Sequence, residues 1–305
     1  MKIQKPFLKW VGGKSQLLNI LVPMLKDITC DNYHEIFLGG GSVLLAILSL
    51  KREGLITIRK DVYAYDYNIH LINLFKTIQT NLHTFYPVLK EYKDNFDLCP
   101  DKNAYKIKRK SPKPETLDEA TLSKEHYYYW LRNIYNNTKD IVHKSALFLL
   151  LNKICFRGVY RENPKTGHFN VPYGNYKTYC IPCLEELEEI SLLIKDVHFI
   201  HRSYTTSILN IGEEDFAYFD PPYAPINEKS FTSYTASGFS LEDHIGLFEM
   251  IGNLKNKYIL SNADVPLVRE YFNDDKYNIQ VVSCKRSIHS KNPGARVDEV
   301  LIRNL

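Results

Sequence analysis

The stretch of residues 34–50 constrains the fold of this chain more than any other. A short apolar run, HEIFL, leads into three glycines, and an apolar pattern with helical spacing follows over SVLLAILSL. A strand, a glycine turn and a helix in this order are typical of an α/β sheet with parallel strands. Residues 62–65 predict a second strand that ends at Asp66, and residues 69–77 predict the helix after it.

This α/β pattern stops in the middle of the chain and then resumes. Residues 77–151 have helical periodicity, interrupted at 99–114 by a basic, proline-bearing segment that predicts a loop. Residues 152–179 are rich in aromatic and β-branched residues around a turn sequence at 163–167, and they predict a β-hairpin. Helices are expected again at 184–194, 241–254 and 265–272, and strands at 197–201, 216–219, 257–261, 279–283 and 299–302. We predict one α/β domain, residues 1–75 and 180–305, with an inserted helical and hairpin domain at 76–179.

The inserted segment carries the positive charge of the chain. Residues 76–177 hold 18 lysines and arginines against 10 acidic residues, whereas the rest of the chain holds 21 against 25. A basic segment between near-neutral or acidic flanks is typical of a module that binds phosphate groups. Charge alone also fits a lysine-rich helical surface that only faces solvent.

The glycine turn and Asp66 together indicate a site for a nucleotide-like ligand. Phe37, Gly39 and Gly41 lie at the strand-to-helix turn, where glycine lets the backbone approach a ligand and the helix N-terminus favours anionic groups. Asp66 follows the next strand, 25 residues after Gly41, where a carboxylate can accept hydrogen bonds from ribose hydroxyls. A merely flexible glycine turn is the alternative.

The sequence FAYFDPPY, residues 216–223, is the most specific motif in the chain. A predicted strand delivers Asp220, Pro221, Pro222 and Tyr223 to the carboxyl edge of the sheet. The prolines restrict the backbone to an extended form, which holds the Asp220 carboxylate and a proline carbonyl in place as hydrogen-bond acceptors. Tyr223 offers a face on which a planar ligand can stack. The alternative is an Asp-Pro-Pro turn that only ends the strand.

The sequence FLKWVGGK, residues 7–14, ends like a P-loop without matching one. The P-loop pattern requires glycine where this chain has Leu8, and no clear strand precedes the segment. An NTPase is therefore disfavoured, and we expect Trp10 and Lys14 to be an aromatic residue and a cation that close over a ligand. A buried tryptophan beside a surface lysine is the alternative.

Together these motifs resemble those of the Dam-like, N6-adenine-specific family of DNA methyltransferases. The matching segments are FLKWVGGK (7–14), EIFLGGGSVLL (35–45), Asp66, FRGVYREN with HFNVPYGNY (156–176), DPPYAP (220–225) and FTSYTASGF (231–239). The resemblance covers nearly the whole chain. It implies a Rossmann-like, S-adenosylmethionine-dependent methyltransferase sheet with an inserted target-recognition domain. It also implies an S-adenosylmethionine site made of Trp10, Lys14, Phe37, Gly39, Gly41, Asp66 and Asp220.

By the same resemblance, the predicted hairpin binds double-stranded DNA. Phe156 resembles an aromatic wedge beside a flipped base, and Arg161 and Pro172 match positions that face bases. Weaker candidates are Arg157, Val159, Tyr173 and Tyr176. Packing of the hairpin itself is the alternative role for about half of the aromatic residues.

The chain departs from the family pattern at a few positions. Ile36 stands where the family usually has proline, which affects only the rigidity of the turn. Arg157 replaces a small polar residue, and the turn at 162–168 is slightly longer than in close relatives. The last two changes lie in the recognition segment, so the usual GATC target is not carried over.

The resemblance predicts direct methyl transfer to the exocyclic amino nitrogen of an adenine flipped out of the duplex. The lone pair of that nitrogen is delocalised into the ring, so acceptors for its hydrogens would turn the lone pair toward an electrophile. Asp220 and a proline carbonyl can be those acceptors. Neither a covalent intermediate nor a metal is expected, since Tyr223 rather than a cysteine follows the prolines and no convincing acidic cluster is visible.

Two other functions stay open at this level. One is an adenine methyltransferase that acts on RNA, and the other is a catalytically inactive regulator that only binds DNA. The intact DPPY sequence, Trp10 and Lys14 argue against the second. A cognate restriction endonuclease is a candidate functional counterpart.

The protein is expected in the cytoplasm or on the nucleoid, with no membrane partner. No apolar run approaches the roughly 18 residues of a membrane span, and the start MKIQKPFLKW lacks a signal-type apolar stretch. The six cysteines are scattered, so free thiols are expected. Cys180 and Cys183 have metal-ligand spacing, but no second pair of ligands accompanies them.

Overall fold

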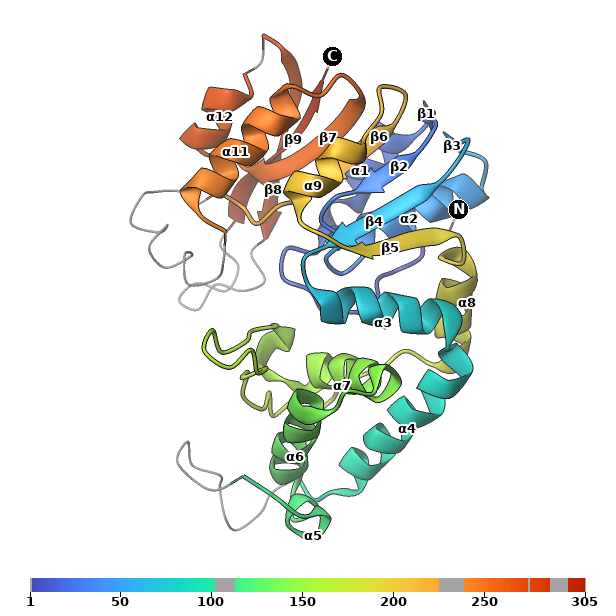
Figure 1. Ribbon diagram of the computed structural model, residues 1–305, viewed down its shortest axis with the longest axis vertical. Helices are drawn as coiled ribbons and strands as arrows, with labels where there is room; N and C mark the ends of the chain where they lie inside the picture. The colour runs from blue at the N-terminus through green and yellow to red at the C-terminus, as the bar shows by residue number, and fades with distance from the viewer. Residues whose placement is uncertain (1, 102–112, 225–238, 274, 286–295, 305) are drawn as a thin grey trace. The chain divides into compact units, whose positions relative to one another are not determined.

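The computed structural model describes residues 2–101, 113–224, 239–273, 275–285 and 296–304 (Figure 1). The chain divides into two compact units. The first comprises Met1–Ile3, Lys14–Asn68 and Asp196–Leu305, and the second comprises Gln4–Gly13 and Ile69–Lys195. The observed second unit is therefore larger than the predicted insertion at 76–179, and it includes a segment near the N-terminus. Its assignment to target recognition stays a prediction.

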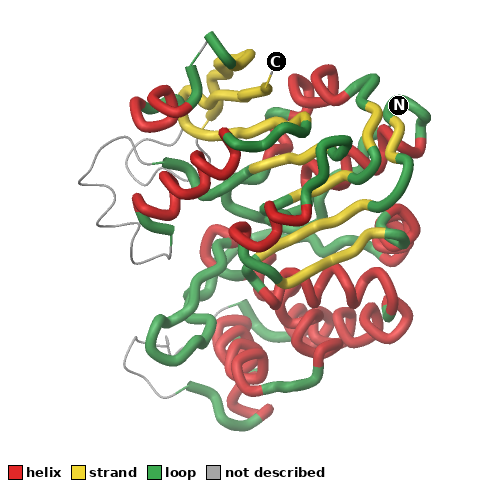
Figure 2. Tube along the Cα trace, turned by 45° about the horizontal axis from the view of Figure 1, so that its top comes forward, coloured by secondary structure: helices red, strands yellow, loops and turns green. Residues whose placement is uncertain are grey.

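The first unit is built on a seven-stranded sheet of order β5-β4-β2-β6-β7-β9-β8, whose strands lie next to one another in yellow in Figure 2. The first five strands in this order are parallel, and β9 runs antiparallel between β7 and β8. The bounds are β2 (Tyr33–Glu35), β4 (Val62–Asp66), β5 (Val197–His201), β6 (Phe216–Phe219), β7 (Lys257–Ala263), β8 (Tyr277–Lys285) and β9 (Arg296–Asn304). A separate parallel pair is formed by β1 (Thr29–Cys30) and β3 (Thr57–Ile58). The predicted α/β fold with a mainly parallel sheet is confirmed.

Helices cover both faces of this sheet. In Figure 1, α9 (Tyr204–Ser207), α11 (Leu241–Gly252) and α12 (Pro266–Tyr271) lie in front of it, and α1 (Leu18–Leu25) and α2 (Ser42–Arg52) lie behind it. Short 3-10 turns, η1 (Lys14–Gln16) and η3 (Ile208–Asn210), complete the unit. All nine residues at 42–50 of α2 are buried, as expected for a stretch that is apolar at every position except Ser42 and Ser49.

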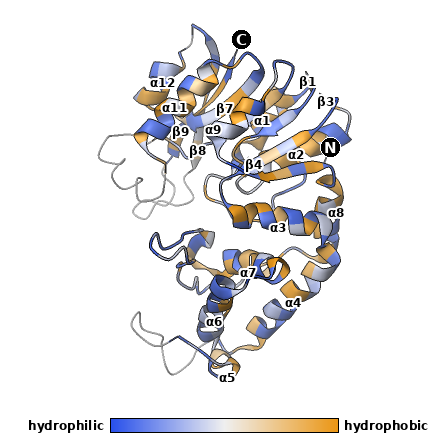
Figure 3. Ribbon diagram, viewed as in Figure 1, coloured by the Kyte–Doolittle hydropathy of each residue, from blue (hydrophilic) through white to orange (hydrophobic). Residues whose placement is uncertain are grey.

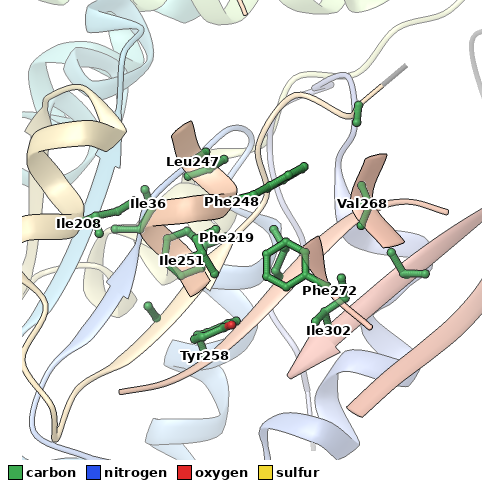
Figure 4. Close-up of a cluster of buried hydrophobic side chains, with 14 of the residues drawn as sticks. Ile36, Ile208, Phe219, Leu247, Phe248, Ile251, Tyr258, Val268, Phe272 and Ile302 are labelled. Carbon is green, nitrogen blue, oxygen red and sulfur yellow. The ribbon is translucent and has the colours of Figure 1, made fainter. Parts of the chain in front are cut away.

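One core cluster joins the front helices to the strands (Figure 4). Leu247, Phe248 and Ile251 of α11 contact a set that includes Phe219 of β6 and Ile302 of β9. These side chains are almost completely buried. Full burial of a leucine, isoleucine or phenylalanine contributes about 1.5–3 kcal/mol, so this cluster fixes the position of β6 in the sheet.

The second unit is mainly helical. Its helices are α3 (Ile69–Thr80), α4 (Leu82–Leu98), α5 (Leu117–Ala120), α6 (Lys124–Asn137), α7 (Ile141–Ile154) and α8 (Leu184–Leu193), with the 3-10 turn η2 (Phe156–Gly158). Ser123 and Asp140 accept backbone N–H groups and so cap the starts of α6 and α7. Apolar and polar positions alternate along α3 and α4 in Figure 3, as expected for helices with one buried side. In the described part of the chain, none of the helices combines the length and apolar character needed to span a membrane.

The predicted β-hairpin at 152–179 differs from the structure. Residues 152–154 belong to α7, and two isolated antiparallel bridges, Cys155 with Tyr173 and Glu162 with Phe169, join the two arms in place of continuous strands. Arg157 and Gly158 have φ values of 57° and 64°, which turn the backbone out of the extended form. Pro164 and Pro172 also lack the N–H group that a ladder requires. The segment is therefore an antiparallel loop that turns at 163–167.

Candidate active site

The strand order changes direction at β2, and the candidate site lies at that point. The chain moves from β2 to β4 and β5 on one side, and later to β6 and β7 on the other. Glu35 of β2 lies opposite Ala64 of β4 and Tyr218 of β6 in the parallel register. The segments that follow these three strands therefore leave the sheet at the same edge. Open α/β sheets bind ligands at such a switch point.

The glycine turn after β2 is joined to the acid after β4. Gly39 and Gly41 have φ values of 50° and 72°, a left-handed conformation that glycine adopts without strain. The Gly39 N–H group donates to Oδ2 of Asp66 at 2.9 Å, and the Asn68 N–H group donates to Oδ1 at 2.8 Å. Burial raises the pKa of Asp66, and these N–H groups oppose that shift. A carboxylate has about four acceptor positions, so Asp66 retains capacity for the hydroxyls of a ligand.

Asp220, directly after β6, forms an ion pair with Lys14 of η1. Both carboxylate oxygens lie 2.6 Å from the Lys14 Nζ atom, and the two side chains are 4% and 18% exposed for Lys14 and Asp220, respectively. The alternative interpretation of Lys14 as a surface residue is therefore wrong. Burial raises the pKa of the Asp220 carboxyl, and the Lys14 ammonium acts in the opposite direction. The pair keeps a buried acceptor available next to the sheet edge.

A hydroxyl group on β7 also contacts Asp220. The Ser261 Oγ atom donates to Oδ1 of Asp220 at 3.2 Å, and it lies 2.8 Å from the hydroxyl of Tyr218. This bond lowers the pKa of Asp220. Ser261 is completely buried in the sheet, so its hydroxyl is held in a fixed position.

The rest of the DPPY motif is held by side chains from β7 and β9. The Ala224 N–H group donates to Oδ1 of Asn262 at 3.0 Å. The Tyr223 hydroxyl donates to Oε2 of Glu299 at 2.7 Å, and the Lys14 Nζ atom lies 4.8 Å from the centre of the Tyr223 ring. Pro221 is buried and Pro222 is exposed. The motif thus leaves the sheet as a rigid segment with a fixed carboxylate and a fixed aromatic plane.

Phe37 begins a small aromatic cluster beside the glycine turn. Its ring stacks on Tyr204 at a centroid distance of 5.8 Å and meets the edge of Phe239 at 6.3 Å. Phe37 is half-buried. The cluster gives the turn an apolar wall that suits the adenine ring of a nucleotide-like ligand.

A second buried acid lies close to the Lys14–Asp220 pair. The Tyr33 hydroxyl donates to Oε2 of Glu35 at 2.7 Å. Burial raises the pKa of Glu35 to about 8, and the Asp220 charge acts in the same direction. Burial thus favours the neutral form of Glu35, which limits the negative charge beneath the site.

Trp10 belongs to the second unit, whereas the other six cofactor candidates belong to the first. Its ring is half-buried, stacks on Tyr160 at 6.1 Å and lies 6.2 Å from Phe148. The adjacent backbone is fixed by Asn152, which accepts the Lys9 N–H group and donates to the Lys9 carbonyl. Trp10 is thus a supported aromatic residue, and its role in ligand binding stays a prediction.

Three of the predicted DNA-binding residues are exposed at the start of the 155–176 loop. Phe156 is 47% exposed, although it is a large apolar side chain. The guanidinium of Arg157 lies 5.2 Å from the centre of the Phe156 ring. Arg161 is exposed, and its Nε atom donates to Oδ1 of Asn170 at 2.7 Å. These side chains are available to a partner, as the prediction requires.

The remaining four DNA candidates differ in how closely they are packed. Val159 is half-buried, and Tyr173 lies 5.4 Å from Tyr128 and 6.2 Å from Phe96. Pro172 is exposed, and its carbonyl accepts the N–H group of Phe156. Tyr176 is 36% exposed, with the Lys9 ammonium 4.6 Å from its ring centre. The packing alternative therefore fits Tyr173 better than the others.

Two parts of the predicted pattern fall outside the described residues. They are Pro225 of DPPYAP and residues 231–238 of FTSYTASGF, of which Phe239 alone is described. Cys180 and Cys183 are free and exposed. Among the described residues, no three or more His, Cys, Asp and Glu side chains are grouped to hold a metal ion.

Comparison with known proteins decides the family. Residues 10–288 match the family described as D12 class N6 adenine-specific DNA methyltransferase. The chain belongs to this family. It is 34% identical to the Type II methyltransferase M.MjaIII of Methanocaldococcus jannaschii, over 98% of this chain and 99% of that protein. It is also 31% identical to the DNA adenine methylase of Escherichia coli K12, over 99% of this chain and 95% of that protein. The predicted family and the predicted DNA adenine methyltransferase activity are confirmed.

Several residues at the site of this methyltransferase were not predicted from its sequence. Ser261, Asn262 and Glu299 contact the DPPY motif, and Tyr204 contacts Phe37. Ser261 and Asn262 are polar residues in the middle of the strand sequence KYILSNA, which is otherwise apolar apart from its first residue. Buried polar side chains need partners, so this interruption was a usable signal. Glu299 had no comparable signal, because its strand sequence RVDEVLIRN mixes charged and apolar residues.

Proposed function

We propose that this methyltransferase uses S-adenosylmethionine to methylate the exocyclic amino nitrogen of an adenine flipped out of double-stranded DNA. The observation that carries the proposal is the position of Asp220. It is a largely buried carboxylate, paired with Lys14 and placed beside Tyr223, at the sheet edge that also holds the glycine turn. A carboxylate and a stacking surface at a nucleotide-binding switch point suit a planar base with an amino group.

The residues of the first unit fit S-adenosylmethionine. The turn at Gly39 and Gly41 brings backbone close to a ligand, and Asp66 has acceptor capacity for ribose hydroxyls. Phe37 supplies an apolar surface for the adenine ring of the cofactor. Lys14, Asp220 and Trp10 complete the proposed set. When bound, the cofactor supplies an electrophilic methyl group on a positively charged sulfur.

The DPPY residues act on the target base. Asp220 and the carbonyl of Pro221 accept hydrogen bonds from the amino group, which turns the nitrogen lone pair away from the base plane. Lys14 and Ser261 oppose the effect of burial on the pKa of Asp220, and this favours its ionised, accepting form. The nitrogen loses one proton when it gains the methyl group, and the Asp220 carboxylate can take that proton. Tyr223 holds the base plane by stacking.

The loop at 155–176 is proposed to contact the DNA. Phe156 presents an exposed aromatic ring that can fill the space left by a flipped base. Arg161 can donate to base edges in the major groove, and Arg157 and Tyr176 are further exposed candidates in the same loop. The relative from Methanocaldococcus jannaschii is named a Type II methyltransferase, which supports a restriction endonuclease of the same target sequence as functional counterpart.

A methylation assay tests the proposal directly. Purified protein is incubated with labelled S-adenosylmethionine and with duplex DNA or RNA of the same sequence, and nucleosides are analysed by mass spectrometry. We expect N6-methyladenine in DNA and none in RNA. Equal methylation of RNA would show that the proposed substrate is wrong.

Variants separate the mechanism from general stability. Asp220→Asn should reduce methyl transfer by at least about a hundredfold, because the amide cannot act as a charged acceptor. Asp61→Asn is the matched control, since Asp61 is exposed just before β4 at the opposite edge of the sheet. Full activity of Asp220→Asn would contradict the assigned role. Sequencing of methylated sites in treated DNA then identifies the target.

A further inference from the structure

The last two strands of the sheet bring an acidic side chain to the DPPY motif. β9 pairs antiparallel with β7, and Glu299 lies opposite Ala263 in that register. Residues 261 and 262 of β7 hold Asp220 and Ala224, on either side of Tyr223. Glu299 contacts Tyr223 itself, because its Oε2 atom accepts a hydrogen bond from the Tyr223 hydroxyl at 2.7 Å. The antiparallel strands thus add a third point of attachment to the motif.

We propose that Glu299 is a positioning residue that fixes the plane of the Tyr223 ring and so sets how the target adenine stacks. The inference rests on the proposed function, in which Tyr223 is the stacking surface. Glu299 itself does not need to touch the base, the cofactor or the reacting atoms.

The geometry defines the orientation of the ring. A tyrosine side chain can rotate about two bonds, so a stacking plane requires constraints beyond the backbone. The Glu299 carboxylate holds the hydroxyl end of the Tyr223 side chain, and such charge-assisted hydrogen bonds are about twice as strong as neutral ones. The Lys14 ammonium lies 4.8 Å from the ring centre and interacts with one face. A base that stacks on Tyr223 is therefore directed to the opposite face.

The placement of Glu299 supports a specific role. Val297 and Leu301, which lie on the same face of β9 as Glu299, are apolar, and Glu299 is half-buried. A carboxylate in such a position costs free energy unless it accepts hydrogen bonds. The hydrogen bond from the Tyr223 hydroxyl offsets this cost for Glu299. The hydroxyl keeps its proton and remains a donor, because burial and the nearby charges of Asp220 and Glu299 hold the pKa of Tyr223 well above its ordinary value.

Three variants test the inference. Glu299→Leu removes the acceptor, Tyr223→Phe removes the donor, and Glu299→Gln keeps an acceptor oxygen without the charge. Loss of a hydrogen bond to a charged group predicts about a tenfold to hundredfold lower kcat for the first two variants, with an unchanged KM for S-adenosylmethionine. Glu299→Gln should lower kcat by no more than about fivefold, since the acceptor oxygen is kept and only the charge-assisted part of the bond is lost. Asp298→Asn, an exposed neighbour on β9, is the matched control and should behave as the wild type.

A fluorescence measurement separates positioning from a structural effect. Duplex DNA with 2-aminopurine at the target adenine reports base flipping and stacking through its emission. Glu299→Leu and Tyr223→Phe should change the emission of the bound complex in the same direction, and the double variant should be no slower than the slower single variant. Urea unfolding of each variant checks that the fold is intact.

The outcomes are distinct. The inference would be overturned if Glu299→Leu kept the kcat and the emission of the wild type. It would also be overturned if Glu299→Gln were as slow as Glu299→Leu, because charge rather than hydrogen-bond geometry would then be responsible. If Glu299→Leu does not fold, Tyr223→Phe and Glu299→Gln still decide the question. A wild-type protein that methylates no DNA would overturn the proposed function, and this inference with it.

Discussion

Replacement of Lys14 by methionine should leave Asp220 as a buried carboxylate without its ion-pair partner. Both carboxylate oxygens lie 2.6 Å from the ammonium, and the Lys14 and Asp220 side chains are 4% and 18% exposed. Breaking a buried ion pair by removal of one partner costs about 3–5 kcal/mol. Ser261 still donates to Asp220 in the variant, so we expect the lower end, about 3 kcal/mol at pH 7.

Urea unfolding at pH 7 measures this cost, and a double variant identifies its origin. The double variant Lys14→Met with Asp220→Asn leaves neither charge buried, so it should be more stable than Lys14→Met alone by at least about 1 kcal/mol. The control is Lys60→Met. Lys60 pairs with Asp31 at 2.8 Å on the surface, where its side chain is 61% exposed, and its loss should not change the unfolding midpoint measurably.

The pH dependence of Lys14→Met follows from the same pair. Lys14 lowers the pKa of Asp220, so its removal raises that pKa further above the ordinary value of 3.8. A carboxyl whose pKa is raised on folding binds more protons in the folded state, and stability falls as pH rises. The destabilisation should therefore shrink as pH falls toward 4. A midpoint equal to that of the wild type at pH 7, or a double variant as unstable as Lys14→Met, would refute this reasoning.

Three further predictions follow from single residues. Burial raises the pKa of Glu35 to about 8, so the stability of the protein should decrease as pH rises from about 4.5 to 8. Glu35→Gln should flatten this decrease in thermal unfolding experiments. An unchanged pH profile in the variant would argue against a buried neutral acid. Burial lowers the pKa of His244 to about 4, so stability present above pH 6.5 should be lost as pH falls toward 4, and His244→Leu should reduce this acid loss in the same assay. Arg161→Ala should reduce the ratio of methylation at the target sequence to methylation at sequences that differ from it by one base, by about tenfold or more. Lys165→Ala, at the tip of the loop, should leave this ratio unchanged. Equal losses of Arg161→Ala on all sequences would contradict base recognition by Arg161.

Much of the α/β framework was predictable because it depends on local patterns. The strands at β4, β5 and β6 follow short apolar runs that end at acidic or polar residues, and the expected helices after β2 and β4 are present with small differences at their ends. The glycines at 39 and 41 adopt the left-handed conformation that their position in a strand-to-helix turn requires. Each of these features is determined within about ten residues of chain.

The loop at 152–179 shows where local patterns fail. Alternating aromatic and β-branched residues indicate strands, but the left-handed Arg157 and Gly158 and two prolines limit pairing to isolated bridges. The side chain of Asn152 also binds the carbonyls of Lys9 and Gly158, which fixes the start of the loop to a distant segment. β-Propensity describes the fit of side chains to a pleated surface, and this segment does not form one.

The sequence by itself determined the chemical groups of this methyltransferase: a glycine turn, an acid after the second strand, and an aspartate, two prolines and a tyrosine after a third. Only the tertiary structure decided which of these groups meet. Lys14 and Asp220 are 206 residues apart, and Glu299 reaches Tyr223 from a strand 76 residues later. Such pairs depend on strand order and register, because neighbours in a sheet are set by the packing of the whole unit, whereas each motif is encoded within a single short segment.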